Sequence, residues 1–137
     1  MHLKKLNLAI TLAFTTIFIG CATAPWEGMS ETEITAWNAA GVSPQTAKQY
    51  EAAGINPDLY TVWLENEILP SEILSWDGAS FDPVEAGAWK KIGLTPKTAA
   101  TWKSESFSPE ETALWLKSDF SLKEAVKERA KGLQPIQ

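Results

Sequence analysis

The stretch Gly41-Val42-Ser43-Pro44-Gln45-Thr46-Ala47-Lys48-Gln49-Tyr50-Glu51-Ala52-Ala53-Gly54 contains both the start and the end of one short helix. Ser43 suits the N-cap, because its hydroxyl accepts a hydrogen bond from a free backbone N–H of the first turn. Pro44 follows at the first helical position, where no backbone donor is lost. Gly54 suits the left-handed residue that closes a helix. The stretch therefore predicts a helix of about ten residues, or ~15 Å.

The same pattern recurs along the chain in three columns that share a 13-residue spacing. The aromatic column contains Trp37, Tyr50, Trp63, Trp76, Trp89, Trp102 and Trp115. The proline column contains Pro44, Pro57, Pro70, Pro83, Pro96, Pro109 and Pro135, with Leu122 as the one substitute. The apolar column contains Met29, Val42, Ile55, Ile68, Phe81, Leu94, Phe107, Phe120 and Leu133. Three columns in one register indicate an internal tandem repeat.

The repeat predicts an all-α fold: an array of about eight short helices, stacked as a compact solenoid or helical bundle, over residues 30–132. One long helix is excluded, because an interior proline costs about 3 kcal/mol or more. Strands are disfavoured by the alanine-rich segments that begin with glutamate caps. The expected helices cover residues 31–39, 44–53, 57–66, 70–78, 83–91, 96–105, 109–118 and 122–131.

The apolar residue in each short loop has two predicted contacts. As the second residue beyond one helix, Val42 should touch the aromatic residue three positions before that helix ends. As the residue before the next N-cap, it should also pack against the fourth helical position, here Ala47. Each apolar residue would thus join two successive helices.

Two departures from the repeat lie close together. Leu69 occupies the N-cap position before Pro70, and Glu67 stands where other units have glycine. One interpretation is that the third helix runs on or that its turn differs, with residues 64–88 as the place where the array would bend or open. Gly78 and Gly87 weaken the neighbouring helices. Ordinary drift between repeats is the interpretation we favour.

The first 20 residues are typical of an export signal. Residues 1–5 carry two lysines, and residues 6–20 form a mostly apolar run that is short for a membrane-spanning helix. Phe18-Ile19-Gly20-Cys21 follows and resembles the lipobox of bacterial lipoproteins, although Phe18 replaces the usual leucine. Two alternatives stay open: an ordinary secretory signal with an incidental cysteine, and an uncleaved anchor.

The resemblance implies a signal peptide at residues 1–20, and a diacylglyceryl group on Cys21 as the mature N-terminus. It also implies a lipidated tether at residues 21–29, and residues 133–137 would form a C-terminal tail. A residue other than Asp after the cysteine, here Ala22, implies export to the outer membrane, facing the periplasm. The membrane would be contacted through the lipid anchor.

Composition narrows the possible functions. Without residues 1–20 the chain has 10 basic and 17 acidic residues, a formal net charge of −7. This charge disfavours nucleic acid and anionic lipid headgroups as partners. The mature chain would also lack His and a free thiol, which excludes a Cys/His metal site and a nucleophile–His pair. No cofactor is expected, and the first-turn acids, such as Glu85 and Glu111, suit the helix dipoles.

The aromatic column has two interpretations. Exposed indoles would form a ladder that binds glycan rings or peptide, whereas buried rings would supply the core of such short helices. The cap and staple pattern explains the spacing without a ligand, so we favour the core. Trp26 lies off the grid, between tether and array, where it would cap the first helix or meet the membrane interface.

Three functions follow from these patterns. The first is a non-enzymatic envelope lipoprotein that acts as a protein-interaction or scaffold module, with an envelope protein or peptidoglycan as partner. The second is a glycan- or peptidoglycan-binding lipoprotein that uses exposed Trp residues. The third is an enzyme with paired carboxylates in a cleft at Leu64–Ala88. The unit W-x-x-A-G-[apolar]-[S/T/N]-P-x-x-A resembles short helical repeats of assorted bacterial proteins, and this resemblance implies no function.

Overall fold

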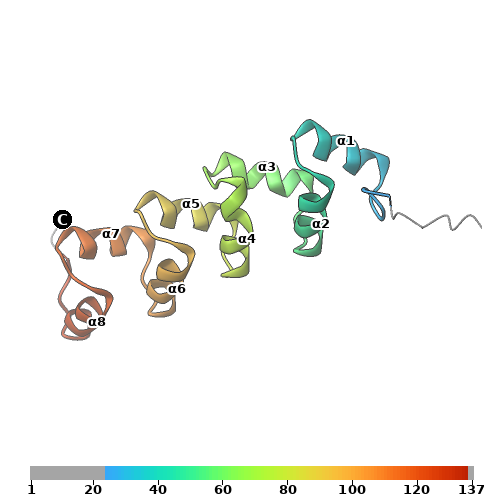
Figure 1. The fold of residues 1–137 in the computed structure, drawn as a ribbon. Coiled ribbons are helices and arrows are strands. Elements are labelled where there is room, and N and C mark those ends of the chain that lie inside the picture. The colour runs from blue at the N-terminus through green and yellow to red at the C-terminus, as the bar shows by residue number, and fades with distance from the viewer. Residues whose placement is uncertain (1–23, 136–137) are drawn as a thin grey trace, which may run out of the picture.

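A computed structural model describes residues 24–135 of the chain, which form eight helices of nine residues each (Figure 1). The helices are α1 (Glu31–Ala39), α2 (Pro44–Ala52), α3 (Pro57–Glu65), α4 (Pro70–Gly78), α5 (Pro83–Lys91), α6 (Pro96–Ser104), α7 (Pro109–Lys117) and α8 (Leu122–Ala130). The described residues contain no strand. The all-α repeat fold predicted from the three columns is confirmed.

The helices alternate between two edges of an elongated array (Figure 1). We call the edge formed by α1, α3, α5 and α7 the odd edge, and the edge formed by α2, α4, α6 and α8 the even edge. Packing contacts join α1 to α3, α3 to α5, α4 to α5, and α5 to α6. A helix therefore packs on its neighbour in sequence and also on the next helix of its own edge.

Side-chain caps start seven of the eight helices. An oxygen of each cap accepts a hydrogen bond from the backbone N–H three residues later; these caps are Ser30, Ser43, Asn56, Asp82, Thr95, Ser108 and Ser121. Leu69 has no side-chain acceptor, so α4 lacks this bond. The carboxylate of Glu72 instead accepts the backbone N–H of Leu69 at 3.0 Å. Half of a capping box is therefore enough to hold the start of α4.

All eight helices end in the same way. Each is followed by a residue with φ between 61° and 84°, and only four of these are glycines; the eight are Gly41, Gly54, Glu67, Ser80, Gly93, Ser106, Asp119 and Gly132. Glu67 thus adopts the backbone of Gly54, and α3 ends at Glu65. The expectation that the third helix runs on or turns differently is wrong, because the closing hydrogen bonds form without glycine. Repeat drift is the correct interpretation.

The closing bonds form a Schellman motif. The N–H of the apolar-column residue donates to the carbonyl of the aromatic-column residue, as from Ile55 to Tyr50 at 2.8 Å and from Ile68 to Trp63 at 3.2 Å. Where the apolar residue is Phe107, its ring meets that of Trp102 edge-on, with centroids 5.1 Å apart. The predicted contact between the loop residue and the preceding aromatic residue is confirmed.

The aromatic column forms the core. Its seven side chains expose at most 5% of their surface. Seven of the eight fourth helical positions are buried too, among them Ala47, Ala86, Ala99 and Ala125, all at 0%. Small side chains there leave room for the indole three positions later on the same helix face. Burying one large ring per short helix gives the array a continuous core.

Tyr50 replaces Trp in the column without breaking the core. Its ring stacks on Trp37 with centroids 5.7 Å apart and lies 5.3 Å from the ring of Tyr60. Its hydroxyl donates a 2.8 Å hydrogen bond to the carbonyl of Pro70, at the start of α4. Burial, and then the neighbouring Tyr60, raise the pKa of Tyr50. The phenol therefore links α2 to α4 through a polar contact.

Residues 24–29, the end of the predicted tether, form a turn at the first helix. The N–H of Glu27 donates to the carbonyl of Ala24 at 2.9 Å. Trp26 and Met29 are half-buried and pack against the core. Trp26 therefore covers the beginning of the array, as one of its two interpretations requires. Cys21 and the export signal lie outside the described residues, and among those described no helix is long and apolar enough to cross a membrane.

Candidate functional site

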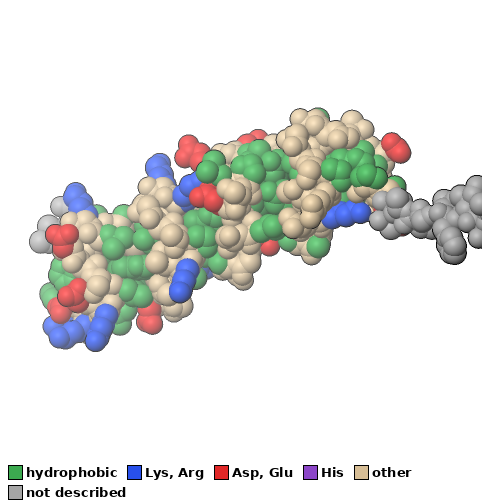
Figure 2. Space-filling model, in the orientation of Figure 1, with side chains coloured by type: hydrophobic (Ala, Val, Ile, Leu, Met, Phe, Trp, Pro, Cys, Tyr) green, Lys and Arg blue, Asp and Glu red, His purple; other side chains and the backbone are tan. Residues whose placement is uncertain are grey.

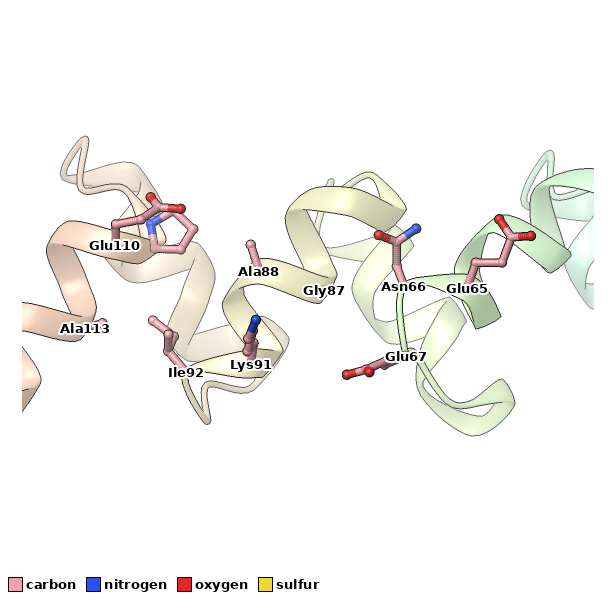
Figure 3. A pocket seen from close by; sticks show the side chains of 10 residues that line it. Glu65, Asn66, Glu67, Gly87, Ala88, Lys91, Ile92, Glu110 and Ala113 are labelled. Carbon is pink, nitrogen blue, oxygen red and sulfur yellow. The ribbon is translucent and has the colours of Figure 1, made fainter.

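A groove that we call the large groove lies on the odd edge, between the C-terminal ends of α3 and α5 and the start of α7 (Figure 3). It is an open groove of about 600 Å³. The lining residues are Glu65, Asn66, Glu67, Gly87, Ala88, Lys91, Ile92, Pro109, Glu110 and Ala113. Residues of three successive odd helices, or of the turns that follow them, thus line one groove.

The groove combines a small apolar floor with a charged rim. Ala88, Ile92 and Ala113 supply the floor, and Glu65, Glu67, Glu110 and Lys91 supply the charges. Figure 3 shows Glu67 and Lys91 on opposite sides of the space between α3 and α5.

The three carboxylates are exposed to water. The arrangement suits binding of a positively charged or hydrogen-bonding group.

Gly87 explains how closely α5 approaches α3. A Cβ atom built at Gly87 would lie 2.9 Å from the carbonyl oxygen of Asn66, the residue that caps α3. The sequence suggests only a weakened helix at this position. In the structure the glycine permits a close backbone contact along the odd edge, and that contact forms one wall of the groove.

Smaller grooves lie between other helices and are lined by residues at equivalent positions of the repeat. One of about 500 Å³ lies on the even edge between α4 and α6, lined by Leu74, Gly78 and Pro96 among others. Another of about 180 Å³ lies between α1 and α3, with Ala36 and Asp58 in its lining. The grooves are therefore a property of the repeat. The grooves differ in the side chains that line them.

Three basic side chains clamp the array across successive units. Lys90 binds the carboxylate of Glu72 at 2.5 Å and the carbonyl of Glu67 at 2.8 Å. Lys103 binds Glu85 at 2.8 Å, and its ammonium lies 4.7 Å from the ring centroid of Phe81. Each cation therefore joins a helix start and a helix end that lie in different units.

The third clamp is made by Arg129 of α8. Its guanidinium lies 3.6 Å from the carboxylate of Glu111 and 3.5 Å from the ring centroid of Phe107. It also donates to the carbonyls of Glu105 and Ser106, which end α6. The sequence alone assigns these charges to the dipoles of their own helices, and the structure uses them between helices.

A signal for the clamps is present in the sequence. The acid stands at the third helical position and the base follows 18 residues later, in the pairs Glu72 with Lys90, Glu85 with Lys103, and Glu111 with Arg129. Where Thr98 takes the acid position, Leu116 takes the base position. Comparing each unit with the next one reveals this pairing, whereas inspection of single units does not.

Three glutamates at helix starts have a lowered pKa. For Glu72 the largest cause is the hydrogen bond from Lys90, followed by the backbone N–H of Leu69. For Glu33 the backbone N–H of Ser30 has the largest effect on the pKa, and for Glu124 the hydroxyl of Ser121 does. In each case donors at the N-cap stabilise the ionised carboxylate.

The aromatic residues considered as a glycan ladder are not on the surface. All seven lie in the core, so the exposed indoles that this alternative requires are missing from the described array. The Nε1 of Trp37 donates to the carboxylate of Glu51 at 3.1 Å. The Nε1 atoms of Trp63 and Trp115 are buried without an acceptor.

Within residues 24–135, no group of three or more His, Cys, Asp or Glu side chains is placed to hold a metal ion. No family model matches the sequence, and comparison with curated proteins and with solved structures finds no similar protein. The fold and its grooves define the chain as a tandem-repeat helical array. Its accessible chemistry lies on the two edges.

Proposed function

We propose that this protein is a non-enzymatic lipoprotein of the cell envelope that serves as a protein-interaction or scaffold module. Support comes from the lipobox-like segment that ends at Cys21, and from the elongated array that follows it. Solenoid arrays offer extended surfaces rather than enclosed pockets. Such a surface suits a partner that covers several units at once.

One observation carries the proposal: most of the exposed large apolar side chains, which the core does not use, belong to the middle units of the array. Among the described residues, the exposed large apolar side chains are Val62, Leu64, Leu69, Leu74, Val84 and Leu133. Five of these six lie between positions 62 and 84. Exposed apolar side chains concentrated in successive units offer apolar area that a protein partner could cover.

The N-terminal lipid would place this surface close to the membrane. From Cys21 to Ser30 a fully extended chain spans about 30 Å. Residues 24–29 already fold against the array, so the usable reach is shorter. The proposed partners are therefore envelope proteins, or peptidoglycan, near the outer membrane.

The anchor is tested by Cys21→Ser. If Cys21 carries the lipid, the variant leaves the membrane fraction while the array stays folded by circular dichroism. Metabolic labelling with a radioactive or clickable fatty acid gives an independent readout, because label must enter the wild type and not the variant. A variant that remains membrane-bound would support an uncleaved anchor instead.

The interaction is tested by site-specific photocrosslinking in intact cells. A photoreactive phenylalanine replaces Lys91, which lines the large groove, and in a matched chain it replaces the exposed Lys123 of α8. We expect discrete adducts with an envelope protein or with peptidoglycan fragments from position 91, and few from position 123. Equal background from both positions would contradict an interaction surface at this site.

A further inference from the structure

We propose that the odd edge carries a docking track for a polypeptide segment that bears both basic and apolar side chains. This inference rests on the proposed function and names the chemistry of the partner. The track consists of the α1–α3 groove, the α3–α5 junction and the large groove that ends at α7. Its floor is apolar and its rim is acidic.

The repeat places two exposed valines on this floor. Ala36 and Asp58 line the α1–α3 groove, and Ala88 and Glu110 line the large groove; the members of each pair are 22 residues apart. Val62 and Val84 have the same spacing and occupy the same repeat positions at the α3–α5 junction. Because α3 packs on α5, we infer from the repeat positions that these two side chains lie at the junction between the two grooves.

These valines have no role in the core. Val84 exposes 66% of its surface and Val62 exposes 37%. The corresponding residues at the next junction are Glu110 and Ala88, which are acidic and small. An apolar segment that covers both valines would gain the free energy of removing them from water, and the small residues on either side leave room for it.

The charges around the track determine the partner's chemistry. Four acidic side chains that line the two grooves, Asp58, Glu65, Glu67 and Glu110, are exposed, whereas Lys91 is the one basic residue in either lining. Acidic side chains outnumber basic ones in both linings, so a basic segment would find complementary charge there.

The charge of the whole array favours the same partner. Residues 24–82 contain ten acidic residues and one basic residue, a formal net charge of −9. Residues 83–135 contain seven acidic and nine basic residues, a net charge of +2. Figure 2 shows most of the basic side chains of this face over the half that carries α5 to α8. A positively charged segment would therefore be attracted to the part of the edge that holds the valines.

The test uses a fluorescent twelve-residue peptide in which lysine alternates with leucine or valine. Binding to the purified array is followed by fluorescence anisotropy at low and at physiological salt. We expect saturable binding that weakens with added salt, because the acidic rim is exposed. A peptide with glutamate in place of lysine, and another with serine in place of the apolar residues, should bind at least about tenfold more weakly.

Matched variants locate the site. Val62→Ser with Val84→Ser removes the apolar floor of the track, and Leu69→Ser with Leu74→Ser removes a similar exposed apolar area at other repeat positions, which belong to the even edge. Both double variants should keep the helical circular dichroism spectrum. We expect the first to weaken peptide binding about tenfold and the second to leave it nearly unchanged. Equal effects would overturn the proposal, since they would indicate non-specific attraction.

Two double variants that each remove two negative charges complete the test. Glu65→Gln with Glu110→Gln should reduce the affinity and its salt dependence, whereas Asp77→Asn with Glu105→Gln, which changes the net charge equally outside the lining of the track, should have a smaller effect. Sedimentation of the free protein tests a second copy as the occupant. Concentration-dependent association that the valine variants abolish would overturn the polypeptide proposal. Peptide binding without any crosslinked partner in cells would instead count against the proposed function alone.

Discussion

Gly78 and Gly87 are both helical glycines, but their surroundings differ. A methyl group at Gly78 would meet nothing within 4 Å, whereas at Gly87 it would lie 2.9 Å from the carbonyl oxygen of Asn66. Alanine stabilises a helix by up to about 1 kcal/mol relative to glycine. We expect Gly78→Ala to raise the free energy of unfolding and Gly87→Ala to lower it, as measured by urea denaturation. The same sign for both variants would mean that α5 moves away from α3 without cost.

The aromatic column permits a second prediction at this scale. Trp89 exposes 2% of its surface, so Trp89→Ala leaves a large cavity and should cost about 3–5 kcal/mol. Leu69 exposes 57%, so Leu69→Ala is the control and should change stability by less than about 0.5 kcal/mol. Chemical denaturation followed by far-UV circular dichroism gives both values. A loss below ~1 kcal/mol for Trp89→Ala would contradict its place in the core.

At the residue scale, the sequence predicted some roles and not others. Ser43 and Gly54 were readable because a cap and a C-terminal turn involve only a few neighbouring residues. The clamp of Lys90 on Glu72 was not predicted, because it depends on how three successive helices are placed. The close backbone contact that Gly87 permits was not predicted for the same reason, because Asn66 belongs to another unit.

At the scale of the element, four helices end on a left-handed residue that is not glycine. Glu67, Ser80, Ser106 and Asp119 have φ between 61° and 63°. This conformation costs a residue with a side chain about 1–2 kcal/mol. Replacing Glu67 by glycine should therefore stabilise the protein by about 0.5–1 kcal/mol after the greater flexibility of the unfolded chain is counted. The reverse change, Gly54→Ala at φ 78°, should destabilise it by a similar amount. Melting temperatures test the opposite signs.

The helix starts make stability depend on pH. The pKa values of Glu33, Glu72 and Glu124 are lowered in the folded protein, so their ionised forms stabilise it above the ordinary glutamate range. This contribution is lost as the pH falls from that range through the lowered values. We expect the melting temperature to drop on acidification, and the triple Glu→Gln variant to drop less. Parallel curves for the two proteins would contradict the role of the caps.

Helix boundaries were predicted to within about one residue, because Ser-Pro starts and glycine ends are local signals. The kind of turn that follows α3 was not predicted. Glu67 gives no sign of a left-handed turn, and the turn forms because the N–H of Ile68 reaches the carbonyl of Trp63 while Ile68 is buried in the core. Tertiary packing selects the conformation there, and the intrinsic preference of glutamate does not reveal it.

At the scale of the whole molecule, the unit of construction is 13 residues rather than a pair of helices. The clamp of Lys90 on Glu72 and that of Lys103 on Glu85 are the same contact, moved by 13 positions from one edge to the other. The alternation of edges and the position of the grooves were not predictable from the sequence, because both follow from the angle between successive helices. Side-chain columns alone do not define that angle.

This construction predicts that one unit can be removed. Deleting residues 96–108 joins Thr95 to Pro109 and preserves a cap followed by proline. We expect a folded protein with less helix in proportion, and with stability reduced by one unit and its interfaces. Deleting residues 99–108 instead places Pro109 within the first turn after Pro96 and should abolish cooperative unfolding. Circular dichroism and urea denaturation of the two deletions show whether folding depends on keeping the 13-residue register or on the number of residues removed.

The clamps and Schellman turns have a kinetic consequence. The side-chain hydrogen bonds and ion pairs of the described chain join residues that are at most 24 positions apart. Contact order is therefore low, and loop closure adds little to the barrier for folding. Any three consecutive units contain the contacts needed to nucleate folding. Folding can therefore begin at several places and spread along the array. Stopped-flow refolding by Trp fluorescence should show a fast phase that a single-unit deletion leaves almost unchanged.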